Sequence, residues 1–199
     1  MAEVTVEMIK ALRARTNCGI MDCKRALVQS GGDEAKAIES LRKQGLAKAV
    51  ERKDRTASEG AMFSYIHHNG RIGVLLQLNC ETDFVARTDE FVRLGSDLCM
   101  QVAAANPLYV SSEEVPGEVL ESEKRIYREQ VEGMNKPENV MERIVEGKLK
   151  GFYEQVCLVD QTFVKEPNER IGNMIDSLSS KLGEKLAVGR FARFEITKG

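Results

Sequence analysis

The stretch 62–80 restricts the possible folds of this chain more than any other part of the sequence. In residues 72–80 every second side chain is apolar, which is typical of a β-strand with one buried face. Residues 62–67 form a second strand-like run, and "HHNGR" lies between the two. Asn69-Gly70 is a strong hairpin signal because both turn residues tolerate positive φ. The sequence therefore predicts an antiparallel β-hairpin, and with it a fold that is not all-helical.

Residues 1–50 are predicted to form a separate domain of three short helices. Apolar side chains recur there at helical spacing, in segments bounded by capping residues and glycines. The start and end signals of the three helices are, in order, Thr5, then Ile20 and Gly31-Gly32, then Asp33 and Gly45. Their expected apolar positions are Val6, Ile9, Leu12, Met21, Ala26, Leu27, Ala37, Ile38 and Leu41. The charged residues 51–56 that follow are predicted to be a linker.

Residues 57–199 are predicted to form an α+β core around the hairpin. Helical periodicity returns after it, with Thr82 or Thr88 as a cap and Pro137 at a favoured first-turn position. The further helices and the closing strand are expected at about 88–106, 117–133, 137–155, 168–182 and 186–197. The predicted fold class is thus α+β, with a small antiparallel sheet and packed helices following the three-helix domain.

Composition excludes several kinds of protein. Hydrophobic residues make up 42% of the chain and charged residues 30%, as in a globular domain rather than a disordered one. No apolar run approaches the roughly 20 residues of a membrane-spanning helix. The five cysteines are odd in number and scattered, and the N-terminus has no signal-peptide pattern. We therefore expect reduced thiols and a cytoplasmic protein, or one of an organelle matrix if a transit peptide has been removed.

The net charge of −2 is unevenly distributed. Residues 1–55 contain 12 Lys/Arg and 8 Asp/Glu, whereas the remainder contains 17 and 23. A basic segment of this size can contact nucleic acid, but residues 1–55 contain no Phe, Tyr or Trp on which bases would stack. Recognition of a protein is therefore the better interpretation, and no direct nucleic-acid binding is expected.

The sequence contains no catalytic constellation. It has neither a phosphate-binding loop nor a GxGxxG motif. His67 and His68 are adjacent, so on a strand they face opposite sides and are poorly placed to share a metal ion. Cys80 falls on the apolar face of its strand, where a thiol is usually inert. We therefore expect that the protein is not an enzyme and that it has neither a metal site nor a cofactor.

A faint internal repeat relates two corners, each of which follows a strand and precedes a helix. The segments "ETDFVAR" and "DQTFVKE" place Phe84 and Phe163 in matching positions, 79 residues apart. A phenylalanine at such a corner normally packs, and the repeat alone favours that interpretation. The preceding residue is Asp83 in the first copy and Thr162 in the second. An acid is therefore not required to build the corner, which indicates an added role for Asp83.

Two signatures give the chain a family resemblance. "LRARTNCGIMDCKRAL" (residues 12–27) and "ETDFVAR" (residues 81–87) resemble the two signatures of the translation elongation factor Ts family, in the same order. "IVEGKLKGFYEQVCLVDQTFV" and "FARFE" are also similar to the family, so the resemblance covers essentially the whole chain. The first signature departs at residues 17–20, where Asn-Cys-Gly-Ile stands in place of the usual Gly-Ala-Gly-Met.

The resemblance implies a guanine nucleotide exchange factor. Such a protein binds elongation factor Tu carrying GDP, promotes GDP release and leaves when GTP enters. It also implies that the three-helix head resembles a ubiquitin-associated domain and binds the partner. For a short family member such as this chain, the resemblance further implies a symmetric homodimer formed through the core.

By the same resemblance, the corner Thr82-Asp83-Phe84-Val85 lies beside the partner's Mg²⁺ site. Phe84 would wedge into an apolar pocket of the partner. Asp83 would disturb the network of waters and side chains that holds Mg²⁺. The head residues implied to contact the partner's nucleotide-binding domain are Arg13, Ile20 and Met21.

Other classes stay open from the residues alone. A cytoplasmic adaptor that binds a partner through its helical head, without exchange activity, would form complexes insensitive to GDP. A nucleic-acid-binding protein would use the basic head and would bind RNA with a steep salt dependence. A thiol enzyme would use Cys80 and would be inactivated by alkylating reagents.

Overall fold

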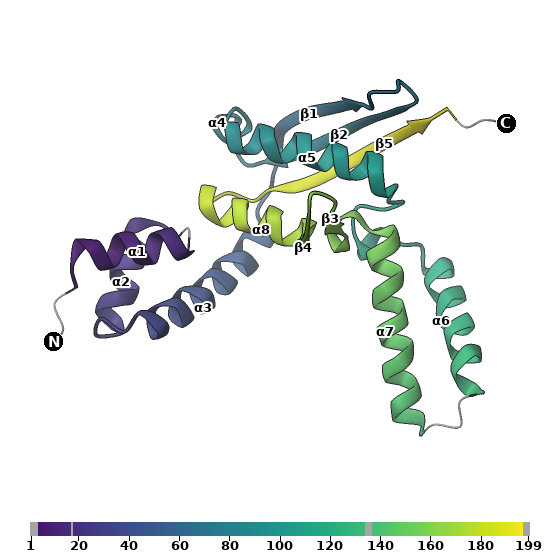
Figure 1. Ribbon diagram of the computed structural model, residues 1–199, viewed down its shortest axis with the longest axis horizontal. Helices are drawn as coiled ribbons and strands as arrows, with labels where there is room; N and C mark the ends of the chain where they lie inside the picture. Colours follow the sequence, from purple (N-terminus) through teal and green to yellow (C-terminus); the bar gives the residue numbers. More distant parts are fainter. Residues whose placement is uncertain (1–3, 17, 134–136, 197–199) are drawn as a thin grey trace. The chain divides into compact units, whose positions relative to one another are not determined.

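The computed structural model describes residues 4–16, 18–133 and 137–196, with the backbone alone for residues 46–53. In this part of the chain, helices combine with a three-stranded and a two-stranded sheet (Figure 1). The predicted α+β class is confirmed. The chain divides into two compact units, one made of residues 1–60, 79–88 and 176–187 and the other of residues 61–78, 89–175 and 188–199.

Three helices open the first unit: α1 (Val6–Thr16), α2 (Ile20–Gln29) and α3 (Glu34–Lys53). They enclose a small core of Ile9, Leu12, Cys23, Ala26, Leu27, Ala37 and Leu41. Val6 and Met21, two of the expected apolar positions of these helices, are exposed. Met21 precedes the buried Cys23 by two positions, which is about 200° around a helix and therefore on the outer side.

The starts of α1 and α3 follow the predicted caps. The Oγ1 atom of Thr5 accepts a hydrogen bond from the N–H of Met8 at 3.3 Å. The Oδ1 atom of Asp33 accepts one from the N–H of Lys36 at 3.1 Å. Each cap satisfies a backbone donor that has no partner inside its own helix.

The two predicted glycine stops behave differently. At the end of α2, Gly31 and Gly32 take positive φ, and the N–H of Gly32 donates to the carbonyl of Leu27 at 2.9 Å, as in a Schellman motif. Gly45, in contrast, lies inside α3, so residues 51–53 of the predicted linker are helical. The sequence after Gly45 is Leu-Ala-Lys-Ala, and these strong helix formers offset the roughly 1 kcal/mol cost of one internal glycine.

The three-stranded sheet contains β1 (Glu59–Ile66), β2 (Ile72–Cys80) and β5 (Ala187–Glu195), in that order. The buried residues of β2 are Val74, Leu76, Leu78 and Cys80, as the alternation predicts. Ile196, just after β5, donates its N–H to the carbonyl of Arg71, just before β2, at 2.9 Å. The end of one strand thus meets the start of the other, which makes this pair antiparallel.

The β1–β2 hairpin forms where "HHNGR" predicts it, but with a different turn. Only Gly70 of the Asn69-Gly70 pair has positive φ. The N–H of Gly70 donates to the carbonyl of His67 at 2.8 Å, and the Oδ1 atom of Asn69 accepts from the N–H of Arg71 at 3.0 Å. The side chain of Asn69 thus bonds the backbone two residues on, which replaces the left-handed conformation expected of it.

Helix α5 (Asp89–Ala105) lies across one face of the sheet (Figure 1). Its buried side contains the predicted residues Phe91, Leu94, Leu98 and Val102. The ring of Phe63, on β1, lies 5.9 Å from the ring of Phe91. A Cβ atom at Gly95 would lie 2.4 Å from the Phe63 ring, so this contact requires glycine at position 95.

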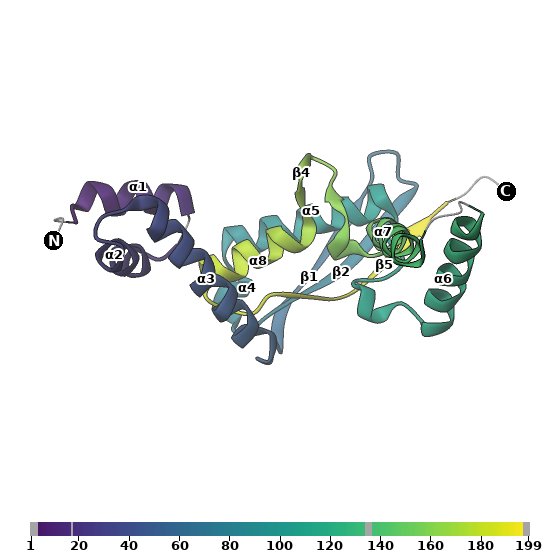
Figure 2. The same cartoon turned by 90° about the horizontal axis from the view of Figure 1, so that it is seen from below.

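Helices α6 (Gly117–Glu132) and α7 (Glu138–Val156) lie side by side, as Figures 1 and 2 show, close to their predicted bounds. Short 3-10 turns precede α6 and follow α7, at Ser112–Glu114 and Leu158–Asp160. The chain then forms β3 (Thr162–Phe163), β4 (Glu166–Arg170) and α8 (Ile171–Leu182).

Helix α8 was predicted to begin at Asn168, but residues 168–170 belong to β4. Arg170 pairs with Thr162 across the β3–β4 ladder. Its guanidinium also forms an ion pair with Glu154 of α7. These contacts with distant residues outweigh the local helical pattern, so the helix starts three residues later.

Candidate partner-binding corner

The predicted corner lies between β2 and α5 and contains the single helical turn α4 (Asp83–Ala86). Thr82 caps this turn with an extended backbone, and its Oγ1 atom accepts from the N–H of Val85 at 3.4 Å. The hydroxyl of Thr88 donates to the carbonyl of Val85 at 2.9 Å and closes the other end. Two threonines of the local sequence thus form the turn.

The turn separates two neighbouring apolar side chains. Val85 is buried, whereas Phe84 is 81% exposed. Its counterpart in the internal repeat, Phe163, is only 6% exposed. The packing role expected from the repeat is therefore right for Phe163 and wrong for Phe84. Phe163 lies on a strand, whereas Phe84 lies in a capped turn whose inward position is taken by Val85.

Asp83, which precedes Phe84, forms an ion pair within the corner. The Nη2 atom of Arg87, one turn later, donates to Asp83 Oδ2 at 2.8 Å. The side chains of Asp83 and Arg87 are 49% and 79% exposed. Exposed ion pairs at this spacing contribute only about 0.3–0.5 kcal/mol. The carboxylate is therefore held loosely and can exchange Arg87 for another partner at low cost.

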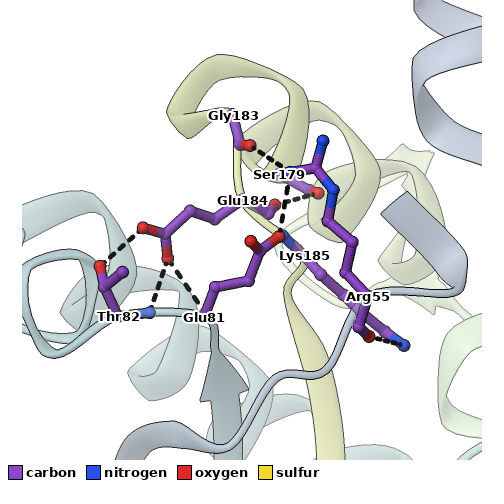
Figure 3. Close-up of polar contacts among 7 residues, drawn as sticks. All are labelled: Arg55, Glu81, Thr82, Ser179, Gly183, Glu184 and Lys185. Carbon is purple, nitrogen blue, oxygen red and sulfur yellow. Dashed lines mark hydrogen bonds and ion pairs between the residues drawn. The ribbon is translucent and has the colours of Figure 1, made fainter. Parts of the chain in front are cut away.

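A carboxylate from a distant part of the sequence holds the start of the corner (Figure 3). Glu184 Oε2 accepts from the backbone N–H of Glu81 at 3.1 Å and from that of Thr82 at 3.0 Å. Its Oε1 atom accepts from the Thr82 hydroxyl at 2.6 Å. Hydrogen bonds to an ionised group are shorter and stronger than neutral ones. Three such bonds fix the two residues that precede α4.

Glu81 in turn binds the segment that carries Glu184. Its Oε1 atom accepts from the backbone N–H of Lys185 at 2.6 Å and from Nη1 of Arg55 at 3.3 Å. The ammonium of Lys185 in turn donates to the carbonyl of Arg55 at 2.9 Å. We call Arg55, Glu81, Glu184 and Lys185 the clamp; Figure 3 shows how its side chains converge.

Cys80 lies next to the corner but is not poised for chemistry. Its Sγ atom donates to the carbonyl of Thr82 at 3.0 Å. Burial raises the pKa of the Cys80 thiol, and the nearby carboxylate of Glu184 raises it further. The thiol is therefore protonated at neutral pH, the form that is neither a nucleophile nor a metal ligand.

The predicted head residues lie on other elements of the first unit. Arg13 is an exposed residue of α1, and Ile20 and Met21 are exposed at the start of α2. Of the loop that departs from the family pattern, Asn17 lies outside the described residues. Cys18 donates its thiol to the carbonyl of Thr16 at 3.5 Å.

The two histidines do not follow the sequence prediction. Both come after the end of β1, and their rings lie in edge contact with centroids 4.2 Å apart, so they do not face opposite sides. Even so, no three His, Cys, Asp or Glu side chains of residues 4–16, 18–133 and 137–196 are grouped to hold a metal ion. Within the same ranges, no helix is both long and apolar enough to cross a membrane.

Comparison with known proteins decides the family. The family model described as "Elongation factor TS" matches residues 20–198 of this chain. The chain belongs to the elongation factor Ts family. Elongation factor Ts of Thermotoga petrophila is 53% identical over 197 residues, which cover 99% of this chain and 98% of the relative. Elongation factor Ts of Myxococcus xanthus is 52% identical, covering 100% and 91%, and that of Caldanaerobacter subterraneus is 50% identical, covering 98% of both.

Membership of the elongation factor Ts family makes this chain a translation elongation factor. The matched range contains both the corner and the clamp. The second signature predicts residues 82–85 as a site, but no sequence pattern predicts a role for Glu184, Lys185 or Arg55. The partners of Glu184 lie about 100 residues earlier in the chain, so the local sequence, including Gly183 at the end of α8, does not reveal them.

Proposed function

We propose that this chain is a guanine nucleotide exchange factor for elongation factor Tu. It binds the GDP-bound partner, perturbs the partner's Mg²⁺ site, promotes GDP release and leaves when GTP binds. The observation that carries the proposal is the 81% exposure of Phe84 on a corner held by the clamp. A large apolar side chain kept in water on a fixed backbone is suited to a pocket on another protein.

The energetics of Phe84 fit a wedge. Transfer of a phenylalanine from water to an apolar pocket is worth roughly 1.5–3 kcal/mol. Because the surrounding backbone is already ordered, little of this free energy is lost in fixing the corner on binding. That amount is enough to change a rate by about one to two orders of magnitude.

Asp83 supplies the second part of the proposed action. In GTPases, Mg²⁺ bridges the nucleotide phosphates and the protein and neutralises their charge. A carboxylate brought beside that ion competes for its waters and for the side chains that order them. The weak contact between Asp83 and Arg87 leaves the carboxylate available for this exchange of partners.

Thermodynamics limits what such a protein does. Suppose that the exchange factor binds the nucleotide-free partner more tightly than the GDP-bound partner. Then the exchange factor lowers the partner's affinity for GDP, and GDP lowers the partner's affinity for the exchange factor by the same ratio. The proposed factor therefore accelerates nucleotide loss and uptake alike. It acts in the cytoplasm by binding alone, without catalytic residues or a cofactor, and the relative concentrations of GTP and GDP set the direction.

A second copy of this chain is the other proposed partner. The exposed apolar side chains of the three-stranded sheet include Met62, Ile66, Leu75 and Phe194. Arg190 of β5 contacts Gln77 of β2 at 3.3 Å, so these two residues lie on the same face of the sheet. Phe194 and Leu75 are separated from them by an even number of positions along the strands and therefore lie on this face too, which is the face away from α5. Exposed apolar sheet faces are typical interaction surfaces. This surface supports a homodimer formed through the core.

The proposed function is tested by stopped-flow release of a fluorescent GDP analogue from elongation factor Tu in millimolar Mg²⁺. We expect wild-type protein to accelerate release and Phe84→Ala to lose most of the acceleration. If the two proteins form a complex but release is not accelerated, the chain is an adaptor and the exchange proposal fails.

A further inference from the structure

Two carboxylates of the clamp exchange hydrogen bonds with the backbone across a sequence separation of 103 residues. Glu184 accepts from the N–H groups of Glu81 and Thr82, and Glu81 accepts from the N–H of Lys185. We propose that Glu184, supported by Glu81, is the positioning residue that orients Phe84 for nucleotide exchange. This inference rests on the exchange function proposed above and adds the group that orients its site.

The orientation passes through the Thr82 hydroxyl. A hydroxyl has one donor and two acceptor lone pairs. Because the donor of Thr82 is used by Glu184 Oε1 at 2.6 Å, the lone pairs remain for the N–H of Val85 at 3.4 Å. Glu184 therefore sets the direction of the cap that starts α4. The backbone of α4 in turn sets the direction of Phe84.

Glu184 is itself fixed from the opposite side, by the end of α8. Gly183 takes a φ of 77°, and its N–H donates to the carbonyl of Ser179 at 2.9 Å. The hydroxyl of Ser179 donates to the carbonyl of Glu184 at 2.5 Å. The carboxylate thus stands at a helix terminus that has hydrogen bonds of its own to α8, as a positioning group requires.

Glu81 and its cations complete the arrangement. The Nη1 atom of Arg55 contacts both Glu81 Oε1 and the carbonyl of Gly183, each at 3.3 Å. Two carboxylates and two cations therefore share one small region, with backbone N–H groups bound to each carboxylate. The charges compensate each other, so the clamp is held without a deeply buried unpaired charge.

Loss of the clamp is expected to affect exchange more than folding. Val85 and Cys80 are buried and are not part of the clamp, so we expect them to keep the chain in place without it. Phe84, in contrast, is 81% exposed and has few contacts of its own, so its direction depends on the backbone that carries it. A mobile corner must be ordered each time it enters the partner, and that entropy cost falls on the exchange step.

The test uses Glu184→Gln in the full chain, a change that keeps the size of the side chain but replaces one acceptor oxygen with a donor. We expect the maximal rate of GDP-analogue release from elongation factor Tu to fall about tenfold, with a melting temperature close to that of wild type. In a Phe84→Ala background the same change should lower the rate less than about twofold, because Glu184 acts through Phe84. Glu118→Gln, an exposed glutamate at the start of α6, is the matched control and should have no effect.

Amide hydrogen exchange of residues 81–85 in the free protein gives a second readout, which does not depend on the proposed nucleotide-exchange function. We expect Glu184→Gln to accelerate it and Glu118→Gln to leave it unchanged. Additive effects of Glu184→Gln and Phe84→Ala on the release rate, or unchanged amide exchange, would overturn the inference. If Glu184→Gln does not fold, Glu81→Gln is tested in the same cycle with the same expectations. Failure of wild-type protein to accelerate release would instead refute the proposed function, and amide exchange would still decide whether Glu184 orders the corner.

Discussion

Phe84 and Phe163 occupy matching positions of an internal repeat, yet Phe84 is 81% exposed and Phe163 is 6% exposed. The two residues therefore form a natural matched pair. Phe163→Ala removes a buried ring and should lower the free energy of unfolding by about 3–5 kcal/mol. Phe84→Ala should change it by less than about 0.5 kcal/mol, because little is buried at this position.

Urea unfolding followed by circular dichroism measures both changes, and GDP-analogue release measures the exchange activity. We expect Phe84→Ala to lose activity while it keeps its stability. Folded Phe163→Ala, assayed at a temperature where it is native, should keep most of its activity. A strong loss of stability in Phe84→Ala would return this residue to a packing role.

Asp83→Asn tests the proposed action at Mg²⁺. The variant keeps the shape of the side chain but removes the charge that would compete for the ion. Relative to wild type, we expect about a tenfold smaller acceleration of GDP release in millimolar Mg²⁺ and less than a twofold difference in excess EDTA. Asp89→Asn, an exposed acid at the start of α5, is the matched control. An equal defect with and without Mg²⁺ would mean that Asp83 does not act on the ion.

Gly95→Ala is expected to destabilise the core by about 1–3 kcal/mol, since a Cβ atom there would lie 2.4 Å from the Phe63 ring. Gly147→Ala, in the interior of α7, makes the same chemical change at a position where, apart from the neighbouring helix backbone, no atom of the described residues would lie within 4 Å of the Cβ atom. It should stabilise the protein by about 0.5–1 kcal/mol through helix propensity. Chemical denaturation of the two variants checks both signs. Adding Phe63→Leu to Gly95→Ala should recover part of the loss; no recovery would assign the cost to another contact.

The buried thiols predict how stability changes in alkaline solution. Burial raises the pKa of Cys99 and of Cys157 to about 11. Between pH 9 and 11 the unfolded chain loses these protons while the folded chain keeps them. The stabilisation is therefore present below about pH 9 and is lost as the pH rises through 11. Each thiol contributes at most about 2–3 kcal/mol to that fall.

Urea unfolding between pH 8 and 10.5, with a reductant present, measures how steeply the free energy of unfolding falls with pH. Cys99→Ala should make this fall less steep. Val102→Ala, a buried deletion on the same helix without a titrating group, should lower the stability equally at every pH. Identical slopes for wild type and Cys99→Ala would exclude this thiol as a source of the pH dependence.

The exposed sheet face predicts a homodimer that a single charge disrupts. Leu75→Glu or Phe194→Glu places a carboxylate in the proposed interface and should give a monomer in sedimentation experiments. Leu108→Glu introduces the same charge at another exposed apolar residue, outside the strands, and should leave the dimer intact. A wild-type protein that is monomeric at micromolar concentrations would refute the dimer proposal.

Local sequence patterns predict much of the fold. The alternation in β2, the caps at Thr5 and Asp33, the glycine stop after α2 and the buried side of α5 each depend on neighbouring residues, and each appears as predicted. The start predicted for α8 is wrong because contacts with residues elsewhere in the chain outweigh the local helical signal. Arg170 joins a strand because Thr162 and Glu154 bind it, and no local pattern reveals those partners.

The sequence by itself determined the family and the position of the corner, because a signature is a run of adjacent residues. It did not determine that Phe84 faces solvent while Phe163 is buried, since both follow a strand and precede a helix. Only the tertiary structure decided this, by burying Val85 and by bringing Glu184 to the N–H groups of Glu81 and Thr82. Such contacts join residues about 100 positions apart, so they exist only once the chain has folded.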